Sequence, residues 1–149
     1  SETMVAGTEK PGWYYSQSGA IPYRRANNEL QVLLITTRGR KRWIVPKGVI
    51  DQGLSARESA AKEAYEEAGA RGQMGQREIG EFQYQKWGGT CTVKVFPLDV
   101  EEVVDDWPES KVRQRKWVGI EEAIHMVDMP ELQEMIRALP ETIESEVYA

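Results

Sequence analysis

Residues 48–70 read GVIDQGLSARESAAKEAYEEAGA, and this stretch decides both the fold and the chemistry predicted for the chain. Ser55 and Glu58 form an S-x-x-E pattern, in which the two side chains cap the first turn of a helix. Gly69 suits the left-handed backbone that commonly follows a helix. The stretch therefore predicts a glycine-bearing loop followed by a helix that begins after Ser55 and ends before Gly69.

Three glutamates share one side of this predicted helix. At about 100° per residue, Glu63, Glu66 and Glu67 lie on one arc. A neighbouring stripe, predicted to pack, holds Ala60, Ala61, Ala64, Tyr65 and Ala68. Carboxylates three and four residues apart repel by roughly 0.2–0.5 kcal/mol per pair unless a cation intervenes, and oxygen ligands favour a hard ion such as Mg²⁺. We expect a metal site, although a solvated helix face, with Lys62 pairing to Glu58 and Glu66, is the alternative.

Length and composition favour one soluble globular domain. The chain has 149 residues, of which 40% are hydrophobic and 29% charged, so a single core is sufficient. The longest apolar run, residues 32–35, is far too short to span a membrane, and no apolar stretch typical of a secretory signal opens the chain. Cys91 is the sole cysteine, so no intrachain disulfide forms. We expect a cytoplasmic protein without a membrane partner.

Basic residues gather in two places despite a net charge of −5. The net charge argues against a nucleic-acid partner, since such binding relies on a basic surface. One group precedes the predicted loop and the other lies downstream: Arg38, Arg40, Lys41, Arg42 and Lys47, then Arg113, Arg115 and Lys116. Arginine pairs with two phosphate oxygens at once, so the groups indicate a small polyphosphorylated substrate. Alternatively, Arg40 and Lys41 occupy a solvated hairpin tip.

Strands and helices are predicted along the whole chain. Runs of apolar and β-branched residues predict strands at 19–24, 30–36, 43–45, 79–84, 90–98 and 115–118, with turns at 26–28 and 87–89. Two helices are expected at 121–127 and 130–139. Pro130 suits the first turn of the last helix, and Pro140 is predicted to end it.

The loop and helix resemble the Nudix box, in which a glycine and a glutamate precede a helix that carries the sequence Arg-Glu and then Glu-Glu. The matching positions are Gly48, Glu63, Glu66, Glu67 and Gly69. Two positions depart from the pattern, because Leu54 replaces the first glutamate and Lys62 replaces the arginine. The resemblance extends over most of residues 17–139. It implies an α+β fold in which a mixed, curved sheet lies between helices in an α/β/α sandwich.

The resemblance is most specific in three segments: RWIVPKG (residues 42–48), the box, and RQRKWVGIEEAI (residues 113–124). Together these segments look like the diphosphoinositol polyphosphate phosphohydrolase branch, whose members hydrolyse diphosphoinositol polyphosphates and dinucleoside polyphosphates with magnesium. The first strand departs from that branch, because Gln17, Ser18 and Gly19 stand where basic residues are usual. We expect one domain over residues 1–149, with an N-terminal extension at 1–16 and a C-terminal tail at 140–149.

The resemblance implies a metal-assisted hydrolysis of a phosphoanhydride bond. Glu63 and Glu67 are the first candidates for metal ligands, with Glu66 and the backbone carbonyl of Lys47 completing the shell of Mg²⁺ or Mn²⁺. Glu66 could instead activate water, and Lys62 would orient a glutamate. The candidate substrate contacts are Arg38, Arg42, Lys47, Gly48, Arg113, Arg115, Lys116 and Tyr84. Tyr84 would stack on a base, or would be an aromatic residue of the core.

Three other questions stay open at this point. A nucleoside triphosphate pyrophosphohydrolase is the alternative within the same reaction class. Leu54 also leaves open a catalytically weak relic that binds phosphorylated ligands. Both a monomer and a homodimer fit the sequence.

Overall fold

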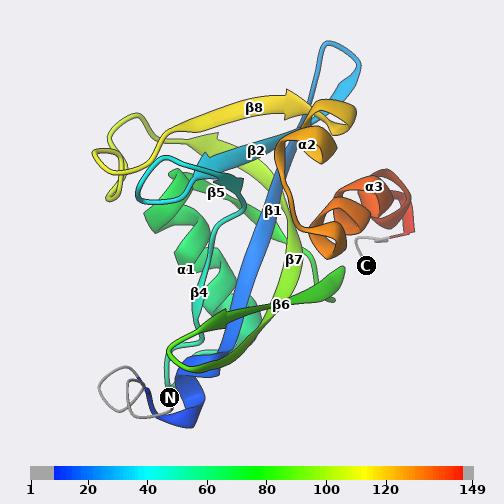
Figure 1. The fold of residues 1–149 in the computed structure, drawn as a ribbon. Coiled ribbons are helices and arrows are strands. Elements are labelled where there is room, and N and C mark those ends of the chain that lie inside the picture. The colour runs from blue at the N-terminus through cyan, green and yellow to red at the C-terminus, as the bar shows by residue number, and fades with distance from the viewer. Residues whose placement is uncertain (1–8, 146–149) are drawn as a thin grey trace.

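The computed structural model describes residues 9–145, so the outer parts of the predicted extension and tail, 1–8 and 146–149, lie outside the described residues. One eight-stranded sheet lies between helices (Figure 1). Its strands are β1 (Ser16–Ala26), β2 (Glu29–Thr36), β3 (Trp43–Ile44), β4 (Lys47–Val49), β5 (Ala70–Met74), β6 (Gly80–Lys86), β7 (Gly89–Val103) and β8 (Arg115–Gly119). The helices are α1 (Ala56–Ala68), α2 (Ile120–Met126) and α3 (Pro130–Ser145), and a 3-10 turn, η2 (Gly12–Tyr15), precedes β1.

The sheet is mixed, as predicted. Its main path runs β3-β2-β1-β7-β5, and β1 pairs with β7 in parallel while the other pairs are antiparallel. β4 pairs with β1, β6 with β7, and β8 with β2. The pairing of β4 with β1 fixes the loop before α1 against the centre of the sheet.

Two hydrophobic cores lie on opposite faces of the sheet. Along β2, Val32 and Leu34 belong to the core that includes residues of α2 and α3, whereas Leu33 and Ile35 belong to the core under α1. This alternation follows from the strand geometry, in which successive side chains point to opposite faces. Figure 1 shows α1 on one side of β1 and the α2/α3 pair on the other. The predicted α/β/α sandwich is confirmed.

Helix α1 begins and ends where the sequence predicts. Ser55 and Glu58 form the reciprocal capping box, and Gly69 has a φ of 69° in the left-handed region. Ala60, Ala64 and Ala68 are fully buried against the sheet. The expectation that Ala61 packs is wrong, because Ala61 is exposed.

The structure corrects the predicted secondary structure in two further respects. The short strands β4 and β5 are missing from the predicted elements, because their pairing partners rather than local sequence define them. Pro140 does not end the last helix, which continues to Ser145. Its continuation buries Ile143 in the core shared with α2 and the sheet, which offsets the backbone hydrogen bond that proline cannot donate. Within residues 9–145, no helix combines the length and apolar character needed to cross a membrane.

Candidate functional site

Two buried glutamates form the centre of the site. Glu63 and Glu67 project from α1 with only 9% and 6% of their surface exposed. A Cβ placed on Gly48 would lie 2.4–2.7 Å from the carboxylate atoms of Glu63, so this carboxylate occupies space that only glycine leaves free. The backbone N–H of Lys47 donates to Glu67 Oε1 at 3.2 Å. The helix and strand β4 thus enclose both carboxyl groups.

The environment of these carboxyl groups favours a cation. Burial is the main cause that raises the pKa of Glu67 to about 8, against the opposing effect of Arg113. Burial also raises the pKa of Glu63. The charge of Glu63 also raises the pKa of Glu67. A divalent ion would neutralise both carboxylates, so their oxygen donors fit a hard cation.

The third glutamate of the box has a different environment. Glu66, with 36% of its side chain exposed, pairs with Lys62 at 3.4 Å, and Lys62 also pairs with Asp51 at 2.8 Å. The predicted contact between Lys62 and Glu66 is present, whereas Glu58 is used in the capping box instead. Among the described residues, no group of three or more His, Cys, Asp or Glu side chains is arranged to hold a metal ion. The carboxylates that face the loop are therefore a pair, Glu63 and Glu67.

Arg113 is the cation nearest to this pair. Its side chain is 9% exposed, and Nη2 lies 3.5 Å from Glu67 Oε2. Nη1 donates to the carbonyl oxygen of Thr36 at 3.0 Å, and Nε donates to Glu109 at 2.7 Å. Arg38 reaches the same Glu109 carboxylate at 3.2 Å, with 64% of its side chain exposed. Glu109 thus brings Arg38 and Arg113, two of the four arginines predicted to contact substrate, to one edge of the site.

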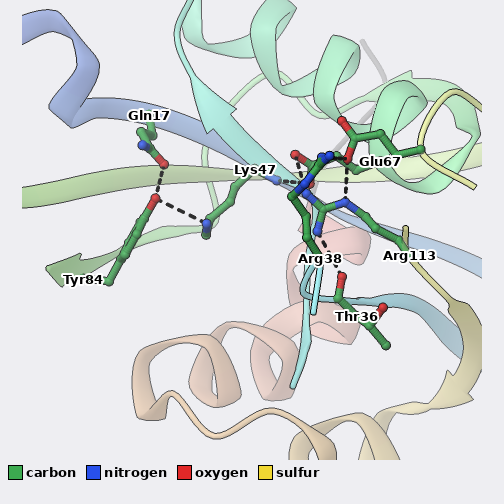
Figure 2. Close-up of polar contacts among 8 residues, drawn as sticks. Gln17, Thr36, Arg38, Lys47, Glu67, Tyr84 and Arg113 are labelled. Carbon is green, nitrogen blue, oxygen red and sulfur yellow. Dashed lines mark hydrogen bonds and ion pairs between the residues drawn. The ribbon is translucent and has the colours of Figure 1, made fainter. Parts of the chain in front are cut away.

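A second cation approaches from the other side of Glu67. Lys47 Nζ donates to the hydroxyl of Tyr84 at 3.3 Å, and Tyr84 donates to Gln17 Oε1 at 2.8 Å (Figure 2). Burial lowers the pKa of Lys47 and raises the pKa of Tyr84. The phenol therefore keeps its proton at neutral pH and donates it to Gln17.

The remaining candidate substrate residues do not contact the glutamate pair. Arg115 donates to the carbonyl oxygen of Ala68 at 2.9 Å and lies over the ring of Trp107, 3.9 Å from its centroid. Lys116 pairs with Glu122 at 3.5 Å. Both line a cleft of about 600 Å³ that also includes Arg113, so this arginine connects the cleft to the site. Arg42 is exposed in the loop between β2 and β3.

Sequence reasoning missed three residues of this arrangement. Asp51 pairs with Lys62, Glu109 joins two arginines, and Gln17 accepts from Tyr84. Only Glu109 had a signal in the sequence, since it stands four residues before Arg113 at a spacing that allows an ion pair within one turn. Asp51 and Gln17 depend on the folding of the loop and on the pairing of distant strands.

The chain is similar to known proteins in sequence. The NUDIX domain family matches residues 17–139 of the chain. Nudix hydrolase 21, chloroplastic, from Arabidopsis thaliana is 36% identical over 131 residues, which cover 84% of this chain and 66% of that protein. Diphosphoinositol polyphosphate phosphohydrolase 3-alpha from Mus musculus is 32% identical over 122 residues, which cover 80% and 73% of the two chains.

A solved structure shows the same fold. The C. elegans Ap4A hydrolase binary complex superposes with a TM-score of 0.73 at 22% identity, over 88% of this chain and 98% of that chain. Nudix hydrolases act on small molecules and generally use a divalent metal. This chain belongs to the Nudix hydrolase family, as indicated by the domain match over residues 17–139, by the relatives above 30% identity, and by the box helix with its paired glutamates.

Proposed function

We propose that this protein hydrolyses a phosphoanhydride bond of a polyphosphorylated small molecule, with Mg²⁺ or Mn²⁺ as the metal. One observation carries the proposal. Two buried carboxyl groups from α1, Glu63 and Glu67, lie beside strand β4, and the guanidinium group of Arg113 lies 3.5 Å from Glu67 Oε2. A buried carboxylate pair next to a guanidinium suits a metal ion and the phosphate that the ion would accompany.

The residues of the site have distinct roles in this proposal. Glu63 and Glu67 would hold the metal, which would neutralise charge on the phosphate oxygens and activate water for attack on phosphorus. Arg113 would bind the phosphate group next to the metal, because its guanidinium is fixed by Thr36 and Glu109. Glu66 and Lys62 would support the loop through Asp51. Exposed Arg38 would contact the outer phosphates.

For the substrate we propose a diphosphoinositol polyphosphate or a dinucleoside polyphosphate. The 32% identical mouse relative is named a diphosphoinositol polyphosphate phosphohydrolase, which supports the first. Both substrates carry more phosphate groups than one arginine can bind, and the cleft beyond Arg113 offers Arg40, Arg115 and Lys116 for the others. The cleft suits a polyanion better than a neutral sugar or peptide.

Hydrolysis assays test the proposal directly. The purified protein is incubated with Mg²⁺ and, separately, diadenosine polyphosphates, diphosphoinositol polyphosphates, nucleoside triphosphates or ADP-ribose, and the released phosphate and nucleotide are measured. We expect turnover of one of the first two classes and its loss in Glu67→Gln. Glu141→Gln, a substitution of an exposed residue on α3, serves as the matched control. Turnover that survives in Glu67→Gln, or its absence with every substrate in both Mg²⁺ and Mn²⁺, would contradict the proposal.

A further inference from the structure

The side chain of Lys47 follows a defined path across β1. Lys47 pairs with Gly19 in the β1–β4 ladder. A Cβ on Gly19 would lie 2.9 Å from Lys47 Cβ and 2.4 Å from the carbonyl oxygen of Pro46, so only glycine allows this close approach. The backbone N–H of Lys47 meanwhile donates to Glu67. One residue therefore contacts the carboxylate pair through its backbone and crosses the neighbouring strand with its side chain.

Tyr84 from β6 holds the end of this side chain. Lys47 Nζ donates to the Tyr84 hydroxyl at 3.3 Å and lies 4.3 Å from the centroid of the same ring. Both contacts come from one aromatic residue, so the ring fixes the direction of the ammonium group as well as its position. No carboxylate is recorded within salt-bridge distance of this ammonium group among the described residues. A hydroxyl and a ring face, rather than a carboxylate, therefore orient the Lys47 side chain, which leaves it open to pair with an anion.

Gln17 completes the arrangement from β1. Its Oε1 accepts from the Tyr84 hydroxyl at 2.8 Å, and its Nε2 lies 3.4 Å from the carbonyl oxygen of Tyr14 and 3.6 Å from Cys91 Sγ. Gln17 is only 2% exposed, so its amide has little freedom to reorient. The amide therefore fixes the phenol, whose hydroxyl oxygen accepts from Lys47, and Figure 2 shows both contacts of this hydroxyl.

We propose that Tyr84 and Gln17 are positioning residues that hold the Lys47 ammonium group for a phosphate of the substrate. The inference rests on the proposed function and assigns a second phosphate contact, on the side of Glu67 away from Arg113. It replaces base stacking as the role of Tyr84, because the ring is already used by Lys47. A flexible lysine that is held in advance loses less freedom when phosphate binds, so the expected effect is on substrate affinity.

A double-mutant cycle tests this coupling. Binding of inorganic tripolyphosphate is measured by calorimetry for the wild type, Tyr84→Phe, Lys47→Met and the double variant. Tyr84→Phe removes the hydroxyl but keeps the ring, and we expect it to weaken binding about 5-fold to 10-fold when Lys47 is present. In the Lys47→Met background the same substitution should change binding less than 2-fold, since no ammonium group remains to be positioned.

Two further variants distinguish a positioning role from a general loss of folding. Gln17→Met should weaken tripolyphosphate binding in the same direction as Tyr84→Phe, and this effect should also vanish in Lys47→Met. Tyr65→Phe is the matched control, because the Tyr65 ring likewise lies under a cation, Arg71, at 4.1 Å, but on α1. In hydrolysis assays Tyr84→Phe should raise KM and leave kcat nearly unchanged.

The outcomes are distinguishable from those of the proposed function. Equal losses from Tyr84→Phe with and without Lys47, or unchanged binding in Tyr84→Phe, would overturn the positioning role while leaving hydrolysis intact. A wild-type protein that neither binds tripolyphosphate nor hydrolyses any substrate would overturn the proposed function, and this inference with it.

Discussion

Gly48→Ala is the substitution whose effect follows most directly from the structure. The added Cβ would meet the Glu63 carboxylate at 2.4–2.7 Å, whereas ordinary contacts of a Cβ begin at 3.4 Å. The carboxylate must therefore move by about 1 Å, and a displacement of about 1 Å in a catalytic group can lower the rate by about 100-fold. The free energy of unfolding should fall by about 1–3 kcal/mol, because the added Cβ meets the end of a side chain that can shift.

The assay compares hydrolysis and metal binding in Gly48→Ala with those of the wild type. We expect kcat to fall about 100-fold and the affinity for Mn²⁺, followed by electron paramagnetic resonance, to fall as well. Gly39→Ala is the matched control, because the nearest atom to its new Cβ is Lys41 Cγ at 3.9 Å. Thermal unfolding checks that both variants are folded. A Gly48→Ala protein that keeps its rate and its Mn²⁺ affinity would refute the idea that Glu63 must lie against the loop backbone.

Three other perturbations have predictable outcomes. Folding raises the pKa of Glu67 from 4.5, the value for a free side chain, to about 8. The metal-free protein should therefore lose stability as the pH rises from about 4.5 to about 8. Thermal melts in EDTA should show a smaller dependence of the melting temperature on pH for Glu67→Gln than for the wild type. Arg113→Ala leaves the buried Glu67 without its ion-pair partner, while the half-buried Glu109 keeps Arg38, so urea unfolding should show a loss of about 3–5 kcal/mol. Pro140→Ala restores an N–H to the interior of α3 and should raise stability by about 2 kcal/mol in the same assay.

The helix of the site could be predicted from sequence because its signals are local. Ser55 and Glu58 satisfy each other within one turn, and Gly69 needs no distant partner to end the helix. The helical periodicity also predicts which of the three glutamates are buried. At about 100° per residue, Glu63 and Glu67 lie closer to the buried stripe around Ala64 than Glu66 does, which agrees with their burial.

The supporting contacts could not be predicted because they join segments far apart in sequence. Tyr84 and Gln17 are 67 residues apart and meet only because β6 and β1 both pair with β7. Arg113 reaches the carbonyl oxygen of Thr36 across 77 residues. Pattern and propensity describe neighbours within a turn or a strand, so they carry no information on such pairs. The candidate ligands were therefore visible in the sequence, whereas the residues that orient them were not.

Leu54, the main departure from the Nudix box, changes the loop without removing its connection to the helix. Leu54 is 37% exposed, so it does not occupy the space between Glu63 and Glu67. The Asp51 carboxylate lies 2.8 Å from Lys62, and the backbone N–H of Asp51 donates to Ser59 Oγ on α1. The loop and helix thus remain joined by a charged contact and a hydrogen bond, and the glutamate pair keeps its burial. This geometry favours an active hydrolase over a binding relic.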